Sequence, residues 1–171
     1  EGGVEDESIR DKYLNRINKS VDRLIYLVKD LDMIAELERG RINIEFTTFN
    51  LTALVQDVID LLEIKAEKNN VKLLLNYPIH QPIKVVGDIQ KIQQVLINLI
   101  VNAINYSNPK TEVTIEFEDF EDKIQVSIKD QGVGIKQEDI DRIFERFYRV
   151  DKSRNRNNGG SGLGLAIVKH I

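Results

Sequence analysis

The feature that most constrains the fold is an apolar repeat near the N-terminus. Apolar side chains recur there at alternating intervals of three and four residues: Leu14, Ile17, Val21, Leu24, Val28, Leu31 and Ala35. This spacing puts them on one stripe of an α-helix, the pattern of a coiled-coil seam. Further apolar residues widen the stripe toward a four-helix bundle: Ile25, Leu27, Ile34 and Leu37. An amphipathic helix packed on its own domain would show the same stripe.

A change of pattern near Gly40 divides the chain into two parts. Gly40 is suited to end the heptad helix as a C-cap. Beyond it Ile42, Ile44 and Phe46 alternate with polar residues, which predicts a strand. We therefore expect a helical segment over residues 1–40 and a separate domain over residues 41–171.

The second part carries helix and strand signals that do not alternate strictly. Asn50 and Asp88 stand where each would cap a following helix. Helices are expected at residues 51–68, 89–106 and 137–147 and from about 163, and strands at 71–76, 83–86, 113–117 and 124–128. The last two strands form a hairpin. These elements predict an α+β fold with helices on one face of a largely antiparallel sheet.

The composition excludes several classes of function. The 171 residues are 42% hydrophobic and 30% charged, as in a globular protein that buries a core. A formal charge of -4 gives no overall attraction to nucleic acid or to an anionic membrane, so we expect no nucleic-acid partner. Without cysteine, and with His80 and His170 as the sole histidines, thiolate and histidine metal clusters are disfavoured. With no signal peptide and no apolar stretch of spanning length, a cytoplasmic location is expected.

Four amide side chains form one stripe of the helix expected at 89–106. They are Gln94, Asn98, Asn102 and Asn105, at offsets of four, four and three residues. Asparagine is a poor helix former, and a polar stripe beside apolar rows needs partners, so it faces either solvent or a polar ligand. An amide oxygen suits Mg²⁺ that phosphate and water otherwise coordinate.

Asp130 and the glycines after it form a second candidate site. Gly132 and Gly134 allow the backbone to turn tightly and to approach a flat ligand closely. Asp130 would accept a hydrogen bond from an exocyclic amine such as that of adenine, between apolar walls from Val133 and Ile135. An ordinary strand-to-helix turn is the alternative.

A glycine-rich stretch precedes the last helix. Six of the ten glycines lie between Gly132 and Gly164, most densely at residues 159–164. Such a turn at a helix N-terminus offers free N–H groups to phosphate. No Lys-Ser/Thr follows and no strand precedes it, which disfavours a P-loop or Rossmann motif. Nearby basic residues either neutralise a polyphosphate or form a solvated charge run: Arg146, Arg149, Lys152, Arg154 and Arg156.

Four motifs in this order resemble those of a known family. Residues 98–107, 130–135, 144–149 and 160–168 are similar to the N, G1, F and G2 boxes of sensor histidine kinases. The resemblance covers roughly residues 12–171. It implies the Bergerat ATP-binding fold shared with gyrase and MutL, a two-layer α/β sandwich with ATP between helices and a flexible lid. The F box and the heptad helix favour the kinase branch.

The resemblance also implies roles for single residues. Asn102 looks like the Mg²⁺ ligand, with Asn98 near the phosphates and Arg149 approaching the γ-phosphate as the third catalytic residue. Tyr106 would pack against adenine, and Asp130 would accept its amino group. The other implied binding residues are Asn105, Gly132, Gly134 and Ile135 beside the base or phosphates, and Ser161, Gly162, Leu163, Gly164 and Leu165 around the phosphates.

The chain departs from the family pattern in two ways. Asn105 stands where the family often has lysine, which removes a positive charge from the phosphate site. Either affinity or rate is then lower, or a lid residue such as Lys152 or Arg154 compensates. The phosphoacceptor histidine is missing, because His80 and His170 lack the expected acidic neighbour and helical context and look structural.

These features together predict the ATP-binding catalytic module of a two-component sensor histidine kinase. Residues 1–40 would be the second helix of the dimerisation and phosphotransfer hairpin, and residues 41–171 a catalytic domain without its closing strands. The intact enzyme would use ATP and Mg²⁺ to phosphorylate a histidine on a dimeric helical bundle and then a response-regulator aspartate. This chain is not expected to phosphorylate itself.

The resemblance further implies a homodimer through the bundle and a receiver-domain partner. The location would be the cytoplasmic part of a membrane-bound sensor, with membrane contact through segments outside this sequence. Two alternatives are a non-catalytic interaction module gated by nucleotide and an ATP hydrolase of the gyrase or MutL kind.

Overall fold

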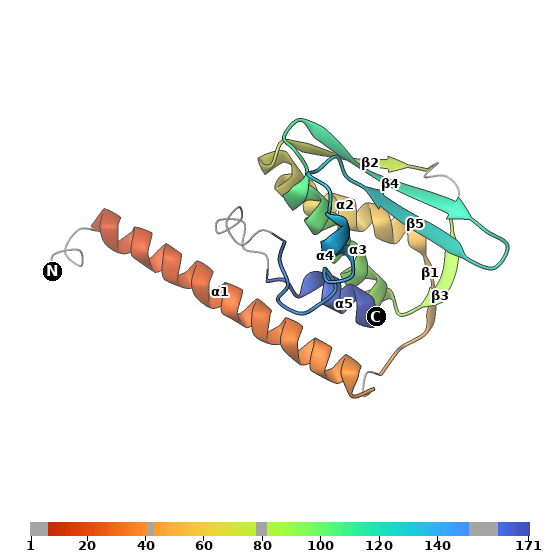
Figure 1. Ribbon diagram of the computed structural model, residues 1–171, viewed down its shortest axis with the longest axis horizontal. Coiled ribbons are helices and arrows are strands. Elements are labelled where there is room, and N and C mark those ends of the chain that lie inside the picture. The colour runs from red at the N-terminus through yellow and green to blue at the C-terminus, as the bar shows by residue number, and fades with distance from the viewer. Residues whose placement is uncertain (1–6, 41–42, 78–81, 151–160) are drawn as a thin grey trace.

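A long N-terminal helix leads into an α+β domain (Figure 1). The structure, a computed structural model, describes residues 7–40, 43–77, 82–150 and 161–171. The helices are α1 (Glu7–Glu38), α2 (Leu51–Lys68), α3 (Ile89–Tyr106), α4 (Gln137–Ile140) and α5 (Gly164–His170). The strands are β1 (Thr47–Asn50), β2 (Val71–Asn76), β3 (Lys84–Gly87), β4 (Thr111–Asp119) and β5 (Ile124–Lys129).

The two long helices of the domain begin at the predicted caps. Asn50 Oδ1 accepts the Thr52 N–H at 3.1 Å before α2, and Asp88 Oδ1 accepts the Lys91 N–H at 3.1 Å before α3. These bonds satisfy N–H groups that the first helical turn leaves free. The pKa of the Asp88 carboxyl is lowered, mainly because the hydrogen bond from the Lys91 N–H favours the charged form.

Strand pairing is mixed. β4 and β5 pair antiparallel, as the sequence predicts, and β1 and β3 also pair antiparallel, which the sequence did not predict. β2 and β4, in contrast, run parallel within the order β2-β4-β5. A parallel pair needs a long crossover, and here β3 and α3 lie between the two strands in sequence.

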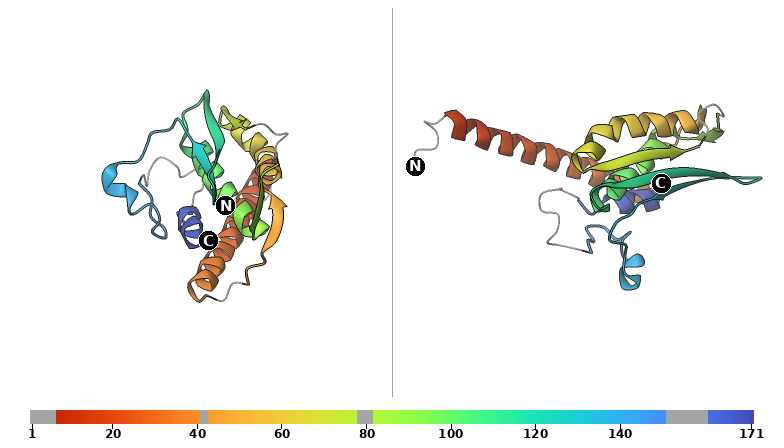
Figure 2. Two further views of the ribbon diagram at one scale, coloured as in Figure 1. Left: turned by 90° about the vertical axis from the view of Figure 1, so that its right-hand side faces the viewer. Right: turned by 90° about the horizontal axis from the view of Figure 1, so that it is seen from above.

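An apolar core lies between the helices and the three-stranded sheet. α2 and α3 pack together on one face of that sheet (Figures 1 and 2). The most deeply buried core side chains are Val55, Val58, Ile100, Ile104, Val113 and Ile115. Burial of a side chain of this size contributes about 1.5–3 kcal/mol. The predicted α+β sandwich is confirmed.

Two predicted elements differ from the structure. The strand expected from Ile42, Ile44 and Phe46 is wrong: residues 43–46 have no regular structure, and residue 42 lies outside the described residues. β1 starts at Thr47 because β3, its partner, pairs with residues 47–50. The helix expected at 137–147 ends at Ile140, and the chain continues in turns to Phe147, whose φ of 60° is left-handed and cannot continue an α-helix.

α1 packs on the domain through its C-terminal part. Ile34 is fully buried with Leu163, Ala166 and Ile167 at α5. An ion pair joins the carboxylate of Glu38 to Arg146. Gly40 follows the helix at φ 61°, the left-handed conformation expected of a C-cap glycine.

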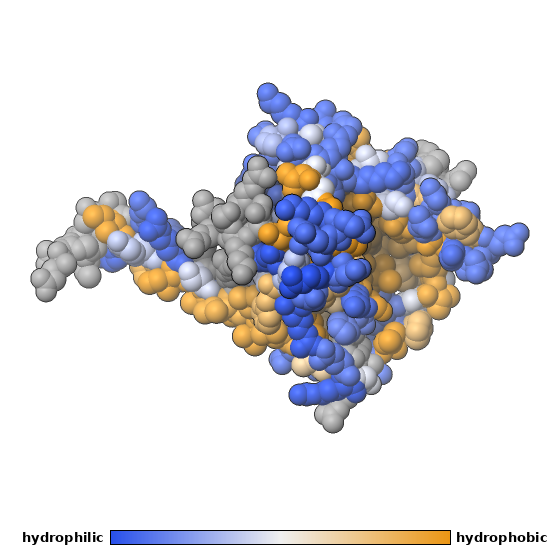
Figure 3. Space-filling view, in the orientation of Figure 1, coloured by the Kyte–Doolittle hydropathy of each residue, from blue (hydrophilic) through white to orange (hydrophobic). Residues whose placement is uncertain are grey.

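Most of the predicted seam is exposed, and only Ala35 among its seven residues is half-buried. Its residues Leu14, Ile17, Val21, Leu24, Val28 and Leu31 are 39–61% exposed, and an apolar band follows α1 in Figure 3. A continuous apolar surface of this kind marks an interaction site. No helix among the described residues is both long and apolar enough to span a membrane.

We expect the chain to self-associate through this seam. Leu24→Glu should weaken the association at least about 10-fold, because a carboxylate would be buried in an apolar interface. Tyr26→Glu is the matched control. Tyr26 is exposed and lies two residues after Leu24, which places it on the opposite side of the helix from the seam. Sedimentation at several concentrations measures the effect, and a concentration-independent monomer would contradict the bundle interpretation.

Candidate functional site

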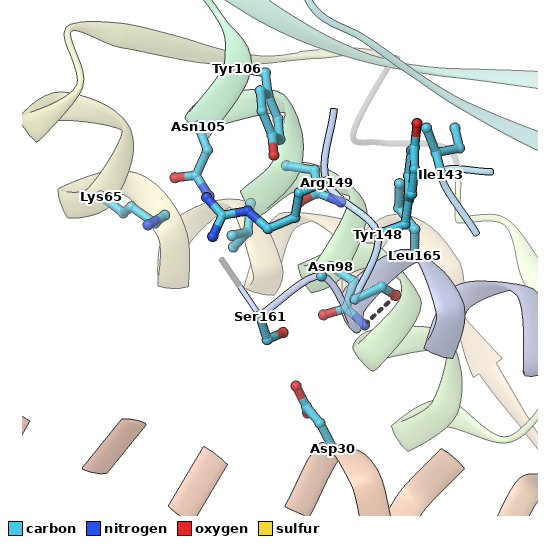
Figure 4. Close-up of a pocket in the computed structure, with 14 residues that line it drawn as sticks. Asp30, Lys65, Asn98, Asn105, Tyr106, Ile143, Tyr148, Arg149, Ser161 and Leu165 are labelled. Atoms are coloured by element: carbon cyan, nitrogen blue, oxygen red, sulfur yellow. Dashed lines mark hydrogen bonds between the residues drawn. The ribbon is translucent and has the colours of Figure 1, made fainter. Parts of the chain in front are cut away.

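A cleft of about 250 Å³ lies where α3 meets the C-terminal segment, with α1 and α2 at its edges (Figure 4). Many of the residues predicted from sequence line it together: Asn98, Asn102, Asn105, Tyr106, Arg149, Ser161, Gly162, Gly164 and Leu165. These residues come from distant segments of the chain: Asn98 and Leu165, for example, are 67 residues apart in the sequence. The fold therefore assembles most of the predicted site in one place.

The amide stripe of α3 faces this cleft. Asn98 Nδ2 donates to the Gly164 carbonyl oxygen at 3.3 Å, and Asn98 Oδ1 accepts from Gln94 Nε2 at 3.4 Å. Asn102, one turn further, lines the cleft and is half-buried. Three of the four amides, Asn98, Asn102 and Asn105, therefore face a cleft, whereas Gln94 does not line it.

Asn105 carries an unusual feature. Its Oδ1 is buried and has no hydrogen-bond partner among the described residues, and the same holds for Ser107 Oγ just beyond α3. A buried polar atom left without a partner costs about 1–3 kcal/mol, so folded proteins rarely keep one. The Asn105 oxygen is therefore available to a bound water or ligand.

The glycine turn after β5 lies against the end of α3. The Gly132 N–H donates to Asp130 Oδ1 at 2.9 Å, and Gly132 forms a bridge with Ser107. A Cβ on Gly132 would lie 2.4 Å from the Tyr106 carbonyl oxygen, so the close approach requires glycine. Asp130 is thereby held near Tyr106, but Asp130 and Gly132 both lie outside the lining of the cleft.

Three other predicted residues also lie outside the lining. Gly134, at φ 70°, has open space around it, and Ile135 is exposed. The Leu163 side chain is fully buried against the α1 cluster, so it faces away from the cleft. Lys152, Arg154 and Arg156, expected on the lid, and His80 fall outside the described residues.

A crossing of two backbone segments at Gly162 shapes the wall opposite α3. The Phe147 N–H donates to the Gly162 carbonyl oxygen at 2.9 Å, and a Cβ on Gly162 would lie 2.9 Å from Phe147 Cα. Gly162 also has a φ of 73°, a left-handed conformation that residues with a side chain rarely adopt. The Leu163 N–H donates to Ser161 Oγ at 3.2 Å, which fixes the entry to α5.

The segment that carries Arg149 is held by its neighbour Tyr148. The Tyr148 hydroxyl donates to the Asp139 carboxylate, which raises the pKa of the phenol. The Arg142 guanidinium lies 4.2 Å from the centre of the Tyr148 ring. These contacts fix the backbone from which Arg149 reaches the cleft.

Sequence reasoning missed five residues of the lining. They are Asp30, Lys65, Val101, Ile143 and Tyr148. Tyr148 could have been found, because it lies inside the motif at 144–149. Asp30 and Lys65 had no local signal, since their positions depend on how α1 and α2 pack. Burial raises the pKa of the Asp30 carboxyl.

Gly132→Ala should lower the free energy of unfolding by about 1–3 kcal/mol, because the new methyl group would overlap the Tyr106 backbone. Gly87→Ala is the control, since its Cβ would meet Phe49 at an ordinary 3.6 Å. Denaturant unfolding measures both variants. Equal stability of the two would mean that the turn does not pack on α3 as described.

The C-terminal part of the chain matches a known protein family. The family described as "Histidine kinase-, DNA gyrase B-, and HSP90-like ATPase" matches residues 87–171. The sensor histidine kinase WalK of Bacillus subtilis (strain 168) is 35% identical over 173 residues, covering 100% of this chain and 28% of WalK. The chain thus spans less than a third of the length of this relative.

Solved structures are similar as well. The histidine kinase AdeS of Acinetobacter baumannii matches with a TM-score of 0.72 and 29% identity, covering 96% of this chain and 72% of that one. The catalytic domain of histidine kinase ThkA matches with a TM-score of 0.64 and 34% identity, covering 74% of this chain and 79% of that one. Histidine kinase ThkA in complex with the response regulator protein TrrA matches with a TM-score of 0.66 and 32% identity, covering 84% of this chain and 42% of that one.

Proposed function

The chain belongs to the family of sensor histidine kinases, and from this premise we propose that the cleft beside α3 binds ATP with Mg²⁺ for phosphoryl transfer to a histidine. The observation that carries the proposal is the amide stripe of α3, which faces a cleft closed by Ser161, Gly162 and Gly164. An amide row opposite a glycine turn offers neutral ligands on one side and room for phosphates on the other.

Asn102 is the residue that we propose to hold Mg²⁺. Its amide oxygen is the hard, neutral ligand that this ion accepts. Among the described residues no group of three acidic or imidazole side chains could hold a metal alone. The ion would therefore bind together with phosphate oxygens and water, and it would neutralise charge on the transferring phosphoryl group.

The chain's own residues would act mainly by positioning. Asn98 ties α3 to the start of α5, which keeps the two walls of the phosphate site in register. Arg149, on the segment fixed by Tyr148, would neutralise negative charge that develops on the phosphate oxygens. Ser161 and the backbone of residues 162–165 would enclose the phosphates.

We propose that the adenine base binds at the end of α3. Asp130 Oδ1 already accepts the Gly132 N–H, which leaves the second carboxylate oxygen for the exocyclic amine. The Tyr106 ring, 44% exposed, would pack against the base. The turn at Gly132 holds Asp130 near Tyr106, which lines the cleft.

Residues 1–40 would be the second helix of a dimerisation and phosphotransfer hairpin, and residues 41–171 the catalytic domain. The exposed seam of α1 supports a homodimeric bundle. Transfer of the phosphoryl group to a receiver-domain aspartate is supported by ThkA, solved with the response regulator TrrA. The whole protein's reaction thus needs a histidine that this chain does not supply.

Calorimetric titration with a non-hydrolysable ATP analogue tests the nucleotide site. We expect saturable binding, weakened about 10-fold by Asp130→Asn, because one charged hydrogen bond to the base becomes neutral. Asp122→Asn, in the exposed hairpin turn, is the control. If a folded chain failed to bind, the non-catalytic interaction module would become the better explanation.

Phosphoryl transfer is tested by adding a separate helical hairpin that carries the acceptor histidine. With ATP and Mg²⁺ the hairpin should be labelled, and Asn102→Ala should slow labelling about 100-fold or more, because metal and phosphate lose their shared ligand. Gln90→Ala, an exposed amide at the start of α3, should have no effect. Phosphate release without any acceptor would instead favour an ATP hydrolase.

A further inference from the structure

Lys65 lines the cleft although it belongs to none of the motifs. It lies near the C-terminal end of α2, is half-buried, and extends toward Asn105 and Arg149 in Figure 4. Among the described residues its ammonium group has no ion pair and no hydrogen bond. A partly desolvated ammonium group without an acidic partner is unfavourable, so this arrangement is suited to a ligand that supplies negative charge.

The charges around the cleft point to the same conclusion. Its described lining contains three side chains that are charged at neutral pH, one negative and two positive: Asp30, Lys65 and Arg149. Asp30 offsets one of the two cations, so Lys65 and Arg149 together give the described lining a net positive charge. Without Lys65 the formal charges of the described lining would sum to zero, which would weaken its attraction for a polyphosphate.

The neighbouring Asn105 adds no charge to this region of the cleft, so Arg149 is the cation that lies beside Lys65 here (Figure 4). Asn105 reaches the cleft from α3, which packs against α2, and its buried oxygen has no partner among the described residues. A neutral amide positions a ligand or water but does not balance phosphate charge. The region between the two helices therefore combines one ammonium group and one amide oxygen, neither of which has a partner in the described part of the chain.

We propose that Lys65 is a phosphate-binding residue of this site, which contacts the phosphate groups of the nucleotide from α2. The inference rests on the proposed function and extends it to a residue outside the four motifs. It makes α2 one wall of the phosphate site and leaves the base end to Tyr106 and Asp130.

Lys65→Met tests this role, because methionine keeps the helix propensity and the apolar stem but removes the charge. The variant should weaken binding of a non-hydrolysable ATP analogue and of ADP about 10-fold and leave adenosine binding within about 2-fold. Lys65→Arg should retain most of the affinity. Lys68→Met is the matched control: it lies one turn further on α2, is exposed, and does not line the cleft.

A second variant tests the placement independently of folding. Asn105→Lys introduced into Lys65→Met should restore part of the lost affinity for the ATP analogue, since it returns one ammonium group to the same part of the cleft. The inference is overturned if Lys65→Met behaves like Lys68→Met, or if it weakens adenosine as strongly as the ATP analogue. No binding by the unaltered folded chain would overturn the proposed function and this inference together.

Discussion

The two faces of α3 determine the arrangement of the domain. Ile100 and Ile104 are almost completely buried in the core between helices and sheet, so they fix the rotation of the helix about its axis. Because side chains at intervals of three and four share a face, Asn98, Asn102 and Asn105 must then point to the other side, into the cleft. Repacking the apolar face would therefore move the site.

α1 joins the two parts of the structure at the cleft. Ile34 packs against Leu163, the residue just before α5, and Asp30, one turn earlier, lines the cleft. The Glu38–Arg146 ion pair connects the end of α1 to the segment that carries Arg149. The position of α1 is thus physically linked to the wall of the cleft, while its exposed seam remains free to contact another helix.

Local patterns predicted the parts of the fold that local interactions determine. The caps at Asn50 and Asp88 and the amide stripe of α3 follow from side chains within a few residues of one another, and the structure has them where the sequence predicts. The strand at 47–50 was missed because its limits are set by the pairing with β3, 34 or more residues away. Lys65 was missed for the same kind of reason, since its role depends on the packing of α2 against α3.

The most direct test is a crystal structure of the chain with a non-hydrolysable ATP analogue and Mg²⁺. The account predicts adenine beside Tyr106 and Asp130, the metal ion on the Asn102 amide oxygen, and the phosphates between the amide face of α3 and residues 161–165. A nucleotide bound elsewhere, or bound in this cleft with its phosphates turned away from α3, would contradict the central claim that the amide face of this helix is the phosphate site.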